Sequence, residues 1–106
     1  MLSDLAERHP EAVEAIYAFS RETETASELE ERVVELVRIA ALIALDGPTI
    51  SFDAHVGRAL KGGVSADDIR GVALAVAPMI GIPRLLKSLP ILEASIAMTH
   101  NSVPAE

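Results

Sequence analysis

Apolar residues recur at intervals of three and four along almost the whole chain, and no segment alternates apolar with polar residues over the length of a strand. A helix brings residues three and four apart onto one face, whereas a strand does so for residues two apart. The pattern therefore predicts an all-α fold. The length of 106 residues suits one domain with its own core, so residues 1–106 are expected to form a single domain.

Helix start and stop signals divide the chain into four main helices and a short N-terminal helical extension over residues 3–20. The stretch RETETAS, residues 21–27, is expected to break the first helix. Ser27 with Glu30, and Ser65 with Asp68, each have the spacing of a capping box that opens a helix. We expect the main helices over residues 28–45, 48–61, 66–80 and 83–98, and a frayed tail over residues 99–106.

Composition excludes several classes of function. The chain has no cysteine, so disulfides, thiol nucleophiles and dithiol redox chemistry are ruled out. Acidic residues outnumber basic ones 10 to 3 in residues 1–35, whereas residues 36–106 contain 6 of each. This acidic excess, with only one Tyr and two Phe, argues against binding to nucleic acid or to an anionic membrane surface.

The longest stretch without a charge, residues 71–83, is well short of the roughly 20 residues that cross a bilayer. The N-terminal residues lack the basic start and apolar run of a signal peptide, so a cytoplasmic protein is expected.

Two of the predicted helices are apolar on more than one face. Only Glu35 and Arg38 interrupt the apolar run over residues 33–45, and residues 71–81 contain no charged residue. A helix that is apolar all round needs neighbours on every side, which a small monomer rarely supplies. The surplus of apolar surface therefore predicts a homo-oligomer.

His55 is the main candidate for chemistry. Its spacing from Phe52, Val56 and Ala59 places it on the apolar stripe of its helix, one turn after Ser51. A hydroxyl at this spacing can hydrogen-bond an imidazole, and an imidazole can exchange a proton near neutral pH. The same pattern also suits a histidine that only fills a core or an interface, and the residues alone leave both interpretations open.

Glu35 and Arg38 are the charges inside the apolar run and can pair at their spacing of three. In a functional role, Arg38 would hold a substrate carboxylate and Glu35 would orient or deprotonate His55. In a structural role, the two would form an ion pair, or Arg38 would extend to solvent. Arg58 suits a solvated face. The three histidines are scattered without metal-ligand spacing, so no metal or other cofactor is expected.

The run H-x-x-x-A-L-x-x-G-V-S-x-D-D-I, residues 55–69, precedes an apolar helix that ends in G-I-P. Together with ELVRIAALIAL, residues 35–45, it resembles the core pattern of the carboxymuconolactone decarboxylase and alkylhydroperoxidase D superfamily. The resemblance covers about residues 29–92. It implies a small helical bundle of the alkylhydroperoxidase D-like type, assembled as a homotrimer or a hexamer.

The redox branch of this superfamily carries a C-x-x-C-x-x-x-H motif. When the histidine of the motif is aligned on His55, Pro48 and Ser51 stand where the cysteines would be. Without thiols the peroxidase cycle is impossible, so the chain is a cysteine-less, non-redox variant.

The resemblance then implies the decarboxylase branch, a lyase activity on a small carboxylated lactone or keto acid. It implies His55 as proton donor or acceptor, Glu35 as the acidic residue of the preceding helix and Ser51 as a hydrogen-bond donor. Arg38 or Arg58 would anchor the substrate carboxylate. The alternative is a non-catalytic helical oligomer of the same fold that acts as a binding or assembly protein.

Overall fold

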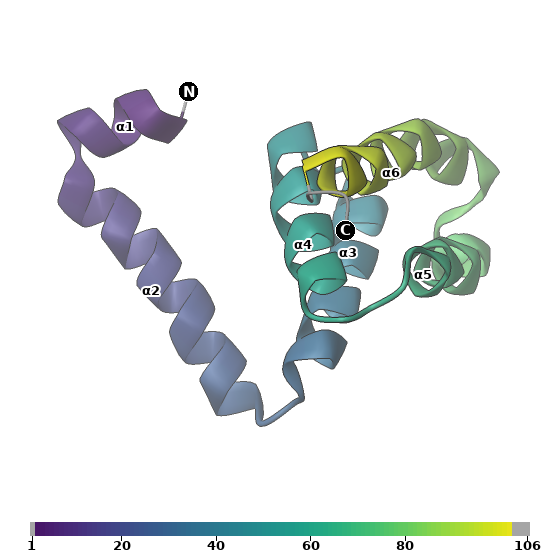
Figure 1. The fold of residues 1–106 in the computed structure, drawn as a ribbon, viewed down its shortest axis with the longest axis horizontal. Coiled ribbons are helices and arrows are strands. Elements are labelled where there is room, and N and C mark those ends of the chain that lie inside the picture. The colour runs from purple at the N-terminus through teal and green to yellow at the C-terminus, as the bar shows by residue number, and fades with distance from the viewer. Residues whose placement is uncertain (1, 103–106) are drawn as a thin grey trace. The chain divides into compact units, whose positions relative to one another are not determined.

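The computed structural model describes residues 2–102, and within them the chain forms six helices and no strand (Figure 1). It divides after Glu30 into two compact units. The first unit contains α1 (Leu2–Arg8) and α2 (Pro10–Ser27); the second contains α3 (Glu31–Leu45), α4 (Thr49–Lys61), α5 (Ala66–Ile80) and α6 (Ile82–Ser102). The prediction of an all-α helical bundle is confirmed.

Helix α2 is longer than its sequence signals predict, because it continues through RETETAS to Ser27. This segment contains no Gly or Pro, and the Thr23 hydroxyl donates to the Phe19 carbonyl at 2.7 Å without disturbing the helix. The helix ends where Glu28 adopts a left-handed conformation, with φ of 59°. The predicted break over residues 21–27 is therefore wrong.

Ser27 belongs to the end of α2 and does not cap the next helix. Its hydroxyl donates to the Glu24 carbonyl at 2.6 Å and accepts from the Leu29 N–H at 3.2 Å. Because α3 begins only at Glu31, the capping box predicted for Ser27 and Glu30 is also wrong.

The helix starts in the second half of the chain lie close to prediction. Pro48 precedes the first turn of α4, where its missing N–H costs no helical hydrogen bond. Ser65 and Asp68 form the predicted capping box of α5, with the Asp68 N–H donating to the Ser65 hydroxyl at 2.9 Å. At the C-terminal end of the chain, α6 continues to Ser102, so the prediction of a frayed tail is wrong for residues 99–102. Residues 103–106 lie outside the described residues.

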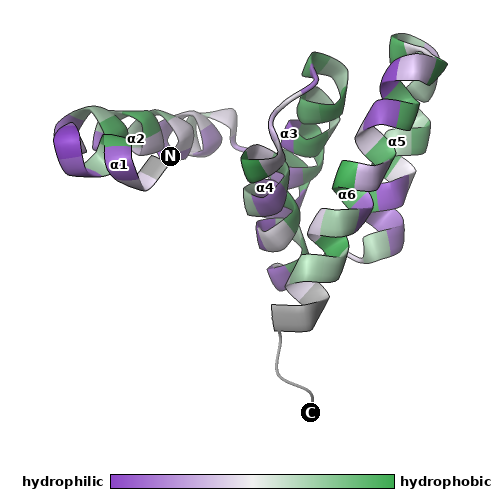
Figure 2. Cartoon of the chain, turned by 90° about the horizontal axis from the view of Figure 1, so that it is seen from above, coloured by the Kyte–Doolittle hydropathy of each residue, from purple (hydrophilic) through white to green (hydrophobic). Residues whose placement is uncertain are grey.

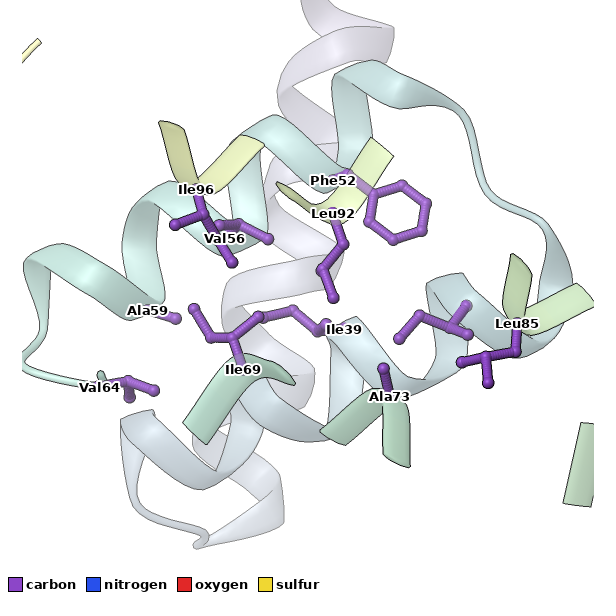
Figure 3. Packing of buried hydrophobic residues seen from close by; sticks show 11 residues of the cluster. Ile39, Phe52, Val56, Ala59, Val64, Ile69, Ala73, Leu85, Leu92 and Ile96 are labelled. Carbon is purple, nitrogen blue, oxygen red and sulfur yellow. The ribbon is translucent and has the colours of Figure 1, made fainter. Parts of the chain in front are cut away.

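Helices α3, α4, α5 and α6 pack around one apolar core (Figure 3). Helix α4 packs against both α3 and α6, and α5 packs against α3 and α6. The core consists of aliphatic side chains and one phenylalanine: Ile39, Ile43, Phe52, Val56, Ala59, Val64, Ile69, Ala73, Leu85, Leu92 and Ile96. Within residues 2–102, no helix has the length and apolar character needed to cross a bilayer.

Small and polar residues join α4 to α6. The hydroxyl of fully buried Ser95 donates to the Asp53 carboxylate at 2.7 Å. One turn further along α4, a Cβ added to Gly57 would lie 3.5 Å from the Thr99 hydroxyl, so the two helices approach closely there. These contacts fix the orientation of α4, and with it the side chains that α4 directs toward α3.

An arginine clamp joins α5 to α6 on the surface. Arg70 donates through Nε and Nη2 to the two carboxylate oxygens of Glu93, at 2.7 and 2.8 Å. The hydrogen bond from Arg70 lowers the pKa of Glu93 below its usual value of 4.5. The same hydrogen bond raises the pKa of Arg70.

We expect Glu93→Gln to lower the melting temperature at neutral pH, and the difference from wild type to close in acid. A carboxyl whose pKa is lowered by folding stabilises the fold above its unfolded pKa, and this contribution disappears as the pH falls through the folded pKa. Thermal melts of both proteins from neutral pH to below pH 4.5 measure the difference in melting temperature. Glu22→Gln, at an exposed position of α2, is the control. If the difference in melting temperature persists below the folded pKa of Glu93, the ionised Glu93–Arg70 interaction is not its source.

Candidate functional site

Glu35 is a buried carboxylate in the second turn of α3. The residue is only 3% exposed and shares the inward stripe of the helix with Val34, Ile39 and Ile43. A carboxylate buried among aliphatic side chains is costly unless it is hydrogen-bonded, so its partner identifies what it does there.

The partner of Glu35 is His55 on α4. Phe52 and Val56 fix the inward face of α4 because both are fully buried, and His55 lies on the same face with its side chain 20% exposed. The Nδ1 atom of His55 lies 2.7 Å from Oε2 of Glu35. The two residues are 20 positions apart in the sequence and meet because α3 and α4 pack against each other.

This hydrogen bond fixes the chemical role of each ring nitrogen. An ionised carboxylate can only accept, so the bond requires a hydrogen on Nδ1 when Glu35 is ionised. The Nε2 atom is then the nitrogen that can accept a proton from a reacting group or return one to it. The pair therefore has the arrangement of a general acid–base whose imidazole is held by a carboxylate.

A small pocket of about 30 Å³ opens beside Glu35. Its lining contains two carboxylates, two guanidinium groups and three small or apolar residues: Glu31, Glu35, Arg32, Arg58, Ala59, Gly62 and Val64. The volume suits a water molecule, whereas pockets for small organic ligands have volumes of roughly 300 Å³ or more. In the isolated chain, this pocket can hydrate Glu35 but cannot enclose a lactone.

Two arginines lie at this pocket, and only one of them is predicted from the sequence. Arg58 is exposed one turn after His55 on α4. Arg32 lies one turn before Glu35 on α3, and its nearest carboxylate oxygen, in Asp68, is 3.9 Å away. The spacing of three between Arg32 and Glu35 was the signal that could have identified it, because such residues share a helix face.

Two further predicted residues, Ser51 and Arg38, lie on the same two helices as the pair. Ser51 lies half-buried one turn before His55, and among the described residues no hydrogen bond joins its hydroxyl to the imidazole. Arg38 is half-buried on α3 one turn after Glu35, and it is absent from the described lining of the pocket. No group of three or more metal-ligating side chains occurs among residues 3–99, whose side chains the structure describes. The structure therefore brings Glu35 and His55 into contact, and Arg58 and Arg32 line the pocket beside Glu35, whose described lining does not include His55.

Comparison with known protein families matches residues 10–94 to the carboxymuconolactone decarboxylase family. The matched region extends from the first residue of α2 into α6 and includes both members of the Glu35–His55 pair. Neither a curated protein nor a solved structure matches the chain.

Proposed function

The chain belongs to the carboxymuconolactone decarboxylase family, and we propose that its Glu35–His55 pair catalyses acid–base chemistry on a small carboxylated lactone or keto acid. The observation that carries the proposal is the 2.7 Å hydrogen bond from His55 to a carboxylate that is only 3% exposed. A burial of this kind is costly, and it is a common way to hold a proton-transferring imidazole in one orientation. The absence of cysteine excludes the thiol peroxidase chemistry of related families.

In a decarboxylation, the bond between the substrate carboxylate and its neighbouring carbon breaks, and carbon dioxide leaves. The electron pair of that bond remains on the carbon and is delocalised onto the carbonyl oxygen of the keto group or unsaturated lactone as an enolate. His55 then donates a proton from Nε2 to the carbanionic carbon, and Glu35 retains the imidazole through Nδ1. A proton from solvent restores the imidazolium for the next cycle.

Arg58 is the residue we propose as the anchor of the substrate carboxylate. It lies three residues after His55 and therefore on the same side of α4, and its guanidinium can bind a carboxylate through two parallel hydrogen bonds. The exposed fifth of the His55 side chain is the surface from which a substrate can reach the imidazole. Arg38 and Ser51 stay as predicted contributors to substrate binding and hydrogen bonding.

The test is a turnover assay with a panel of small γ-lactone carboxylates and β-keto acids, between about pH 5 and 9, where an imidazole changes protonation. We expect release of carbon dioxide from at least one class, and Arg58→Gln should raise KM more than it lowers kcat. The exposed Lys61→Gln, one turn further along α4, is the matched control and should leave KM unchanged. If no member of the panel is bound or converted at any pH, the proposed lyase function is wrong.

A further inference from the structure

Helix α4 is hydrogen-bonded to a neighbouring helix on each of two sides. On one side, Nδ1 of His55 lies 2.7 Å from the Glu35 carboxylate of α3. On the other side, the Asp53 carboxylate accepts from the Ser95 hydroxyl of α6, also at 2.7 Å. Asp53 and His55 are two residues apart, which places them about 200° apart around the helix axis and about 3 Å apart along it. The two hydrogen bonds therefore hold α4 from nearly opposite sides at almost the same level.

The apolar contacts of α4 restrict its rotation less sharply than these hydrogen bonds. Helix α4 carries hydrophilic residues between its hydrophobic ones (Figure 2), and its buried hydrophobic residues are Phe52, Val56 and Ala59. Their attraction to the core has no preferred direction, so it changes little when the helix turns by a few degrees about its own axis. A hydrogen bond weakens quickly with distance and angle. The polar contacts on its two sides therefore set the rotation of α4.

The contact with α6 is the better shielded of the two hydrogen bonds. Ser95 is completely buried and Asp53 is half-buried, whereas the side chain of His55 is 20% exposed. Water can compete for the imidazole but not for the Ser95 hydroxyl, and a hydrogen bond to an ionised carboxylate is stronger than one between neutral groups. Helix α6 therefore holds α4 more firmly than the Glu35–His55 pair alone would.

We propose that Ser95 and Asp53 are positioning residues that keep His55 in the orientation of its hydrogen bond to Glu35. A side-chain atom about 5–6 Å from the axis moves by about 0.5 Å when a helix turns by about 5°. A movement of this size is enough to take the 2.7 Å contact of Nδ1 to the usual limit of about 3.2 Å for an N–H···O hydrogen bond. The pair lies on the α6 side of α4, so it acts on His55 through the helix. Its effect on turnover rests on the proposed lyase function, whereas its effect on the imidazole does not.

Nitrogen-15 NMR of the full chain tests the proposal without a substrate, because the chemical shifts of the two ring nitrogens report which of them carries the proton. A neutral His55 that donates to Glu35 carries its proton on Nδ1, whereas an imidazole without this bond exchanges between two tautomers. At about pH 9, above the usual titration range of an imidazole, we expect wild type to contain the Nδ1–H tautomer alone. Ser95→Ala should contain both tautomers. The signals that disappear in His55→Gln are those of His55.

Ser88→Ala is the matched control. Ser88 is also a buried serine of α6, only 2% exposed, but its hydroxyl donates to the Arg84 carbonyl of its own helix at 2.9 Å. Its removal should therefore leave the tautomer of His55 unchanged. Asp53→Asn keeps an acceptor for the Ser95 hydroxyl and should also retain the Nδ1–H tautomer. The proposal is wrong if Ser95→Ala keeps the Nδ1–H tautomer alone, or if Ser88→Ala or Asp53→Asn contains the same mixture as Ser95→Ala.

Turnover separates this proposal from the proposed function. With a substrate that wild type converts, Ser95→Ala should lower kcat about tenfold and leave KM unchanged, because a displacement of about 1 Å can cost about 10²-fold in rate. Wild-type kcat in Ser95→Ala would overturn the positioning role in catalysis. If wild type converts no substrate, the lyase function fails, and the tautomer measurement still decides whether Ser95 positions the imidazole.

Discussion

His55→Ala is expected to lower kcat on the substrate class identified above by about 10²–10⁴-fold, the range that a positioned general acid or base contributes. The variant removes the nitrogen that exchanges the proton and also leaves the buried Glu35 carboxylate without its hydrogen bond, which costs about 1–3 kcal/mol of stability. Steady-state kinetics and thermal melts of the same preparation separate the two effects.

His55→Gln distinguishes a chemical role of the imidazole from a structural one. The amide of glutamine retains an N–H donor for Glu35 but cannot exchange a proton near neutral pH. We expect its kcat to fall as far as in His55→Ala while its melting temperature stays closer to that of wild type. Comparable loss of stability in both variants, with kcat retained in either, would show that His55 only fills the space between α3 and α4.

Glu35 is a positioning residue in this scheme, because it acts on the substrate through His55. Glu35→Gln would still hydrogen-bond Nδ1, but it would remove the negative charge that stabilises the imidazolium. Its effect should therefore appear in kcat, with KM little changed.

The two capping patterns show how far local sequence signals predict this fold. The Ser-x-x-Asp pattern at Ser65 follows Gly62 and Gly63, which end α4, so the capping box forms where the sequence predicts it. The same spacing at Ser27 follows residues that are compatible with a helix, and α2 continues through them. A capping signal therefore located a helix start only where the preceding residues also stopped a helix.

The Glu35–His55 contact was predictable as a pairing of two polar residues on apolar faces of consecutive helices. The 2.7 Å distance between Nδ1 of His55 and Oε2 of Glu35 could not be predicted, because it depends on how α4 is oriented against α3 and α6. The same is true of Arg32, which shares a helix face with Glu35 and lines a pocket to which Gly62 and Val64, beyond the end of α4, also contribute. Helix faces can be read from spacing, whereas the volume and lining of a pocket require the packed side chains.

Phe52→Ala is expected to destabilise the fold by about 3–5 kcal/mol, a large part of the roughly 5–15 kcal/mol that stabilises a domain. Phe52 is the one aromatic side chain of the core, only 1% exposed, and it packs within the cluster formed by α3, α4, α5 and α6 (Figure 3). Its removal leaves a cavity that the surrounding aliphatic side chains can only partly fill. Urea denaturation at a fixed protein concentration measures the loss.

The matched control is Ile50→Ala, two residues earlier on the same helix and 52% exposed. Both substitutions shorten an apolar side chain of α4, so the difference between them isolates the contribution of core packing from helix propensity. We expect Ile50→Ala to lower the free energy of unfolding by less than about 1 kcal/mol.

The Phe52→Ala variant should also lose activity. His55 lies one turn after Phe52, so loosened packing of α4 also releases the imidazole from Glu35, and kcat of Phe52→Ala should fall at temperatures below its melting transition. Equal destabilisation by Phe52→Ala and Ile50→Ala would mean that core packing does not hold α4 in place. The orientation of His55 would then not be explained by the packing of Phe52.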